Sequence, residues 1–152
     1  MQVSQTRIDD LLLIEPDVYP DERGYFFEHY SRAGYEALGV VAEFIQDNCS
    51  FSRRGTIRGL HYQIGPRAQG KLTSVVHGRV LDVAVDVRFG SPTFGQYVAV
   101  ELSDENHVQF WIPPGFAHGF SVLSETVVFM YKCTSYYSKE HERSIRFDDP
   151  DL

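Results

Sequence analysis

The sequence predicts an all-β domain, built as a sandwich or barrel of short strands. In the segment Arg79–Arg88, Leu or Val alternates with mostly polar residues, the pattern of a strand with two different faces. Short apolar segments separated by Gly, Pro, Asn and Ser recur through the second half of the chain. Nine Tyr and eleven Phe add residues that favour pleated surfaces. Many short strands with regular turn signals are typical of these two architectures.

One helix is expected before most of the strands. Ser31 can act as its N-cap, Tyr35 and Leu38 share a face, and Gly39 can end it. We therefore expect one or two short helices beside the sheets. The expected strands are Leu72–Val76, Arg79–Arg88, Tyr97–Leu102, Val108–Ile112, Gly119–Leu123 and Thr126–Lys132.

The polar face of the strand Arg79–Arg88 has two possible surroundings. It carries Asp82 and Asp86, while Leu and Val occupy the other face. Carboxylates on a strand are most simply explained by a solvated sheet face. In a closed barrel, however, a polar inner face can line a ligand cavity. The alternation alone leaves both possibilities open.

Length and charge limit the class of protein. A single domain over residues 1–152 is expected, because this length can bury one core. Fourteen Lys and Arg against twenty-one Asp and Glu give a net charge of −7, which argues against a surface for nucleic acid. No apolar run reaches the roughly 18 residues of a membrane span. The polar N-terminal stretch carries no hydrophobic signal region, so a cytoplasmic location is expected. Cys49 and Cys133 lack paired spacing and are expected to be free thiols.

The first cluster of chemically useful residues lies in the segment 53–71. Arg58, His61 and Lys71 bring two cations and an imidazole together in an otherwise acidic chain. An imidazole exchanges protons near neutral pH, whereas Arg and Lys suit phosphate and oxyanion groups. The cluster therefore indicates proton transfer on an anionic ligand.

Two further clusters follow. A turn rich in Pro and Gly delivers His118 at the start of a strand, and Tyr131 shares a strand face with apolar neighbours. Taken singly, such a His or Tyr is more often a structural residue. His61 and His118 could both ligate a metal, but the first cluster offers no third ligand, so no metal site is expected.

Several segments in order resemble the RmlC-like dTDP-4-dehydrorhamnose 3,5-epimerases of the cupin superfamily. The most specific are the Arg58–Gln63 block, RGLHYQ, and the Pro113–Phe120 block, PPGFAHGF. The resemblance covers nearly the whole chain and implies a cupin-type jelly roll. It implies a metal-independent enzyme without a redox cofactor. The other matching segments are 21–28, 44–48, 69–72, 78–88, 91–95, 131–132, 141–143 and 148–150.

The resemblance also implies roles for individual residues. His61 would be the general base, Tyr131 the general acid on the opposite face of the sugar, and Lys71 the cation that steadies an enolate oxygen. Tyr137 matches a position that stacks on the thymine ring. The residues expected to bind the nucleotide, diphosphate or sugar are Arg23, Phe26, Glu28, Gln46, Asn48, Arg58, His118, Tyr137 and Glu142.

Two features of this chain depart from the family's simplest pattern. The family orients its catalytic His by an Asp in a C-terminal segment that is expected to be absent here, and Asp82 is our candidate to replace it as a fourth catalytic residue. Strict alternation would also place Arg58 and His61 on opposite faces of a strand. A bulge at Gly59 would bring both into one cavity.

The leading hypothesis is an epimerase that inverts C3 and C5 of a dTDP-4-keto-6-deoxyhexose on the route to dTDP-L-rhamnose. Epimerisation at one carbon of a related nucleotide sugar, a non-catalytic nucleotide-sugar binding module and, last, a metal-dependent cupin oxygenase remain alternatives. A homodimer with N-terminal strand exchange is expected, because the apolar stretch Leu11–Ile14 would otherwise form an exposed edge.

Overall fold

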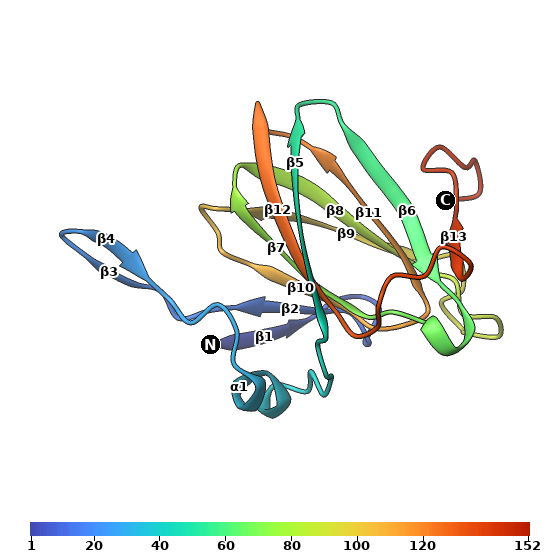
Figure 1. Cartoon of the computed structure of the whole chain (residues 1–152), viewed down its shortest axis with the longest axis horizontal. Helices are drawn as coiled ribbons and strands as arrows, with labels where there is room; N and C mark the ends of the chain where they lie inside the picture. The colour runs from blue at the N-terminus through green and yellow to red at the C-terminus, as the bar shows by residue number, and fades with distance from the viewer.

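Two antiparallel sheets pack face to face in the computed structural model, which describes residues 1–152 (Figure 1). The six-stranded sheet has the order β1 (Gln2–Gln5), β2 (Leu12–Glu15), β10 (Gln109–Ile112), β7 (Lys71–His77), β12 (Thr126–Cys133) and β5 (Gln46–Arg53). The five-stranded sheet has the order β13 (Glu142–Ser144), β6 (Ile57–Gln63), β11 (Phe116–Val122), β8 (Arg79–Asp86) and β9 (Tyr97–Ser103). The all-β prediction is confirmed.

The smaller elements lie outside the sandwich. Strands β3 (Tyr19–Asp21) and β4 (Gly24–Phe26) form a separate hairpin. Figure 1 shows this hairpin projecting from the body on the side opposite β6 and β13. The helices are α1 (Arg32–Ala37) and a single 3-10 turn (Gly65–Arg67). Neither is long and apolar enough to cross a membrane.

Helix α1 lies where the sequence predicts it. Gly39 ends it with a φ of +93°, and the amides of Gly39 and Val40 donate back to the last turn. Ser31 occupies the N-cap position but makes no side-chain cap, because its hydroxyl donates to Glu28 instead, at 2.6 Å.

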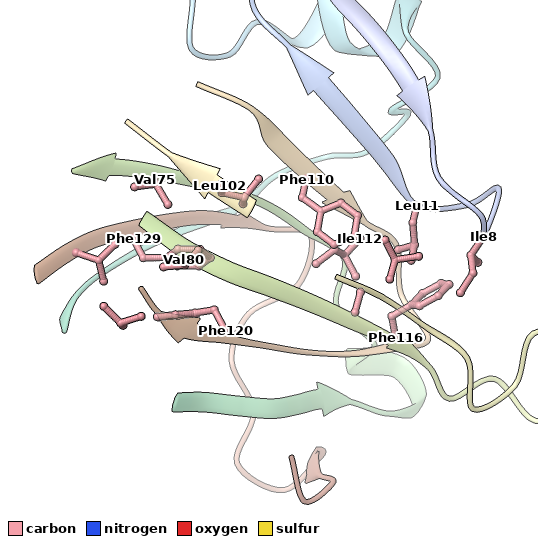
Figure 2. Packing of buried hydrophobic residues seen from close by; sticks show 14 residues of the cluster. Ile8, Leu11, Val75, Val80, Leu102, Phe110, Ile112, Phe116, Phe120 and Phe129 are labelled. Atoms are coloured by element: carbon pink, nitrogen blue, oxygen red, sulfur yellow. The ribbon is translucent and has the colours of Figure 1, made fainter. Parts of the chain in front are cut away.

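A cluster of fourteen buried apolar residues fills the space between the sheets (Figure 2). It includes Phe110 from one sheet and Phe116 and Phe120 from the other. Burial of such rings contributes about 1.5–3 kcal/mol each to the free energy of unfolding. A second cluster holds α1 against the sandwich through Tyr35 and Trp111. A polar cavity between the sheets is therefore possible only where inward-facing side chains do not belong to these apolar clusters.

Strand β8 turns its acidic face to the interior. Asp82 and Asp86 are fully buried, whereas Leu81 on the opposite face is 38% exposed. The strand ends at Asp86, two residues before the predicted end. Arg88 donates to the Asp86 carboxylate through its backbone amide and its guanidinium, which turns the chain away from the sheet.

The expected unpaired edge at Leu11–Ile14 is not present. Strand β2 pairs with β1 on one side and β10 on the other, and both Leu11 and Ile14 are fully buried. The chain covers this stretch with its own N-terminal strand. The edge strand on this side of the sheet is therefore β1, all of whose residues are solvent-accessible.

Candidate active site

Two adjoining cavities between the sheets share the side chains of His61, Lys71 and Tyr131. Their volumes are about 330 and 410 Å³, and we call them together the inter-sheet cleft. The first part is lined by Gln46, Asn48, His61, Tyr62, Gln63, Gln69, Lys71, Tyr131, Tyr137 and Glu142. The second part is lined by Ser50, Ile57, Arg58, Gly59, His61, Lys71, His118, Phe120 and Tyr131.

A bulge at Gly59 brings Arg58 and His61 into this cleft. The two residues are three positions apart on β6, but their Cα partners on β11 are only two positions apart. Gly59 has a φ of +138°, and a Cβ there would lie 2.5 Å from the Gly119 Cα. The predicted bulge is confirmed. Arg58 then extends along the cleft, where its Nε donates to Ser52 Oγ at 2.9 Å.

His61 and Tyr131 line the cleft from opposite sheets. His61 lies on β6 of the five-stranded sheet, and Tyr131 lies on β12 of the six-stranded sheet. Burial raises the pKa of the Tyr131 phenol. The phenol is therefore protonated at neutral pH and can give a proton. The imidazole and the phenol thus line the same two cavities from different sheets.

Lys71 connects the two walls. Its ammonium donates to the backbone oxygen of His61 at 3.4 Å and lies 5.9 Å from the centre of the Tyr131 ring. Burial lowers the pKa of Lys71, while the negative charge available at Cys133, Asp82 and Glu142 opposes this shift. A buried amine with a lowered pKa gives up its proton more readily than an exposed lysine does.

Asp82 does not orient His61, so this expectation is wrong. His118 Nε2 lies 2.6 Å from Asp82 Oδ1, and Thr73 Oγ1 donates to Asp82 Oδ2 at 2.7 Å. Asp82 is fully buried beneath the cleft, where its carboxylate pairs with the imidazole of His118 on β11. Burial lowers the pKa of His118, so its ring is neutral near pH 7 and donates its Nε2 proton to Asp82.

The far end of the cleft is closed by a chain of side-chain bonds. Gln46 Nε2 donates to Asn48 Oδ1 at 3.0 Å, and Gln46 Oε1 accepts the Tyr137 amide at 3.0 Å. The Tyr137 hydroxyl donates to Glu142 Oε2 at 3.0 Å. All four side chains line the same part of the cleft.

Known proteins match the chain over its full length. The profile of the family described as dTDP-4-dehydrorhamnose 3,5-epimerase matches residues 5–152. The enzyme of this name from Pseudomonas aeruginosa is 56% identical over 153 residues, which is 100% of this chain and 84% of the relative.

This chain belongs to the dTDP-4-dehydrorhamnose 3,5-epimerase family.

Solved structures of relatives have the same fold. A 3,5-epimerase from Legionella pneumophila, in complex with dTDP-4-keto-L-rhamnose, superimposes with a TM-score of 0.96 and 56% identity, covering 99% of this chain and 80% of that one. ChmJ, a 3'-monoepimerase from Streptomyces bikiniensis in complex with dTDP-quinovose, superimposes with a TM-score of 0.90 and 34% identity. The match covers 97% of this chain and 75% of that one. The cupin-type jelly roll expected of the family is confirmed.

Three residues that the family resemblance assigned to the ligand lie outside the cleft. Arg23 and Phe26 belong to the projecting β3–β4 hairpin, where they are 85% and 69% exposed. Arg23 pairs with Asp21 of its own hairpin, and Glu28 accepts a hydrogen bond from Ser31. These three residues therefore do not line the cleft of their own chain, and their part in ligand binding stays a prediction.

Sequence reasoning missed several residues that line the cleft of this family member. Ser50, Tyr62, Gln63 and Gln69 all reach it, and none was proposed to act there. Ser50 could have been found, because it follows Asn48 by two positions on a strand and so shares its face. No group of three or more His, Cys, Asp or Glu side chains is arranged to hold a metal ion.

Proposed function

We propose that this chain is a cytoplasmic epimerase that inverts C3 and C5 of a dTDP-linked 4-keto-6-deoxyhexose, giving dTDP-4-dehydro-L-rhamnose. The observation that carries the proposal is the placement of His61 and Tyr131 on facing sheets around one cleft, with Lys71 between them. Epimerisation needs a base and an acid on opposite faces of the sugar ring.

The reaction follows from the acidity that a ketone gives its neighbours. The C4 carbonyl acidifies the protons on C3 and C5, so the His61 imidazole can remove one of them. The electron pair moves onto the carbonyl oxygen, where the Lys71 ammonium stabilises the enolate. Tyr131 then returns a proton to the same carbon from the other face, which inverts it. A positioned acid or base typically accelerates such a step about 10²–10⁴-fold.

Each inversion leaves His61 protonated and Tyr131 deprotonated. The pair must exchange protons with solvent before the second carbon reacts. His61 and Tyr131 can both make this exchange from within the cleft, because each side chain lines both of its parts. The sum of the two inversions is an isomerisation, so no electron acceptor is consumed.

Ligand binding is proposed for the remaining cleft residues. Arg58 offers the guanidinium fork that suits a diphosphate. Tyr137, which is 57% exposed at the rim, offers a ring face for the thymine, and its hydroxyl is held by Glu142. Gln46 and Asn48 supply amide groups along the same wall.

A homodimer would place the projecting hairpin against a second subunit. Tyr19, Tyr25 and Phe26 are each more than half exposed on the hairpin, and Arg23 adds a cation at its tip. A hairpin that presents aromatic rings and one arginine suits the mouth of a cleft that binds a nucleotide diphosphate. We propose that Arg23, Phe26 and Glu28 serve the partner's cleft, and that the exposed strand β1 takes part in strand exchange.

Solvent exchange tests the proposed reaction. The protein is incubated with dTDP-4-keto-6-deoxyglucose in D₂O, and the sugar is followed by proton NMR. Deuterium at both C3 and C5 supports the double epimerase. Deuterium at only one carbon selects the mono-epimerase alternative, which the similarity to ChmJ favours as second candidate. Binding of thymidine diphosphate without exchange at either carbon leaves only the binding module.

A further inference from the structure

One buried hydroxyl in the inter-sheet cleft has no partner. Ser50 Oγ is the only buried side-chain nitrogen or oxygen atom in the chain that makes no hydrogen bond. Ser50 lies on β5, opposite Phe129 of β12, and lines the same part of the cleft as Arg58, His118 and Tyr131. A polar atom left unpaired in a buried place costs about 1–3 kcal/mol, so its retention calls for a reason.

The neighbours of Ser50 on the inner face of β5 are already engaged. Asn48 accepts from Gln46 and donates to the Cys133 sulfur at 3.5 Å, and Ser52 accepts from Arg58. The alternation of β5 places these side chains on the same inner face as Ser50. Of these three inward-facing side chains of β5, only Ser50 makes no hydrogen bond within the protein.

The residues around Ser50 limit the kind of ligand group that its hydroxyl can bind. Ile57 and Phe120, which line the same part of the cleft, have no polar side-chain atom. Two cations line this part of the cleft, Arg58 and Lys71. We assign Arg58 to the diphosphate and Lys71 to the oxygen on C4. A serine hydroxyl can both donate and accept, so it matches a neutral hydroxyl of the ligand.

The chemistry of the substrate then identifies the hydroxyl. C1 of the hexose carries the diphosphate and C3 is the nearer reacting carbon, so C2 lies between the groups assigned to Arg58 and to His61 with Tyr131. Ser50 lines the cleft beside all three of these residues. We propose that Ser50 Oγ hydrogen-bonds to the 2-hydroxyl of the hexose and makes the cleft selective for 2-hydroxy over 2-deoxy sugars. This inference rests on the proposed function and adds a specificity-determining residue to it.

The test compares two substrates in two enzymes. Wild type and Ser50→Ala are assayed for kcat/KM on dTDP-4-keto-6-deoxyglucose and on its 2-deoxy analogue. A neutral hydrogen bond is worth roughly 3- to 10-fold in kcat/KM. We expect Ser50→Ala to lose that factor on the 2-hydroxy substrate and to keep wild-type kcat/KM on the analogue. Ser50→Cys, with its weaker donor, should fall between the two.

A matched control separates substrate binding from folding. Ser74 lies on β7, its Oγ donates to the Met130 backbone oxygen, and it does not line the cleft. Ser74→Ala should lower Tm without changing the ratio of kcat/KM for the two substrates. Ser50→Ala removes no hydrogen bond within the protein, so its Tm should equal or exceed that of wild type.

Three results would overturn the proposal for Ser50. They are an equal loss on both substrates, no loss on either, and a fall in Tm as large as that of Ser74→Ala. Failure of the proposed function is a separate outcome, because wild type would then show no turnover of either substrate. If Ser50→Ala does not fold, Ser50→Cys decides between the same outcomes.

Discussion

His118 on β11 donates its Nε2 proton to Asp82 on the adjacent strand β8, at 2.6 Å and out of contact with bulk solvent. Thr73 from the opposite sheet donates to the second oxygen of the same carboxylate. This pair fixes the ring of His118 under the cleft, with its Nδ1 edge free of Asp82. It also joins the two sheets at the floor of the site.

Replacing this carboxylate should destabilise the fold. Asp82→Ala leaves the buried His118 donor without an acceptor, which costs about 1–3 kcal/mol. It also leaves the Thr73 hydroxyl with only its longer hydrogen bond, to the Phe110 backbone oxygen at 3.3 Å. We expect a loss of about 3 kcal/mol in the free energy of unfolding, measured by urea denaturation. Asp82→Asn keeps one acceptor oxygen and should lose less. Equal stability of Asp82→Ala and wild type would show that the network contributes nothing.

Stability should fall as the pH drops below about 6.5. Burial lowers the pKa of His118, and burial together with Lys132 lowers the pKa of His29, so the unfolded chain binds protons that the native chain does not. Stability therefore rises with pH through this window, by up to about 1.4 kcal/mol per pH unit for each group. Urea denaturation between pH 7.5 and 5.5 measures the slope.

Single histidine variants identify the groups responsible for that slope. His118→Gln and His29→Gln should each flatten the dependence of the unfolding free energy on pH. His77→Gln, at a site where the side chain is 63% exposed, is the control and should preserve the wild-type slope. An unchanged slope in both the His118 and the His29 variants would rule out this account.

Loss of the phenol should separate proton exchange from inversion. In Tyr131→Phe the base remains, so His61 can still remove a proton and return it to the same face. We expect deuterium to enter from D₂O while inversion slows about 10²–10⁴-fold. Tyr136→Phe, at an exposed position, is the control. Inversion at the wild-type rate in Tyr131→Phe would mean that another group is the acid.

Mixing two inactive variants tests whether the hairpin serves a partner's cleft. Arg23→Ala should weaken substrate binding, and His61→Ala should abolish exchange. If Arg23 acts across the interface, mixed dimers contain one site with both residues intact, and activity returns to about one quarter of the wild-type value. Co-refolding of the two proteins followed by the exchange assay measures this. A mixture that stays inactive would place Arg23 in its own subunit.

The bulge should be intolerant of any side chain. In Gly59→Ala the new Cβ meets the Gly119 backbone at 2.5 Å and the residue would keep a φ of +138°. We expect a loss of several kcal/mol in the free energy of unfolding, roughly 3 by analogy with overpacked sites. Gly55→Ala also has a positive φ but meets no atom within 4 Å, so it separates strain from collision.

Short-range patterns account for what could be predicted from the chain itself. Alternation defined strand β8, turn residues separated β7 to β12, and Gly39 ended α1, because each depends on neighbours in sequence. The Gly59 bulge was also predictable, since two useful side chains three residues apart can share a strand face only through an extra residue.

Partners that are distant in sequence were decided by the tertiary structure. Asp82 binds His118 rather than His61, because the register of β8 against β11 determines which imidazole reaches the carboxylate. The pairing of β2 with β1 and the outward direction of the β3–β4 hairpin depend on contacts that no local pattern records. The chain's local pattern thus specifies which groups are available, whereas the packing of two sheets determines which of them meet.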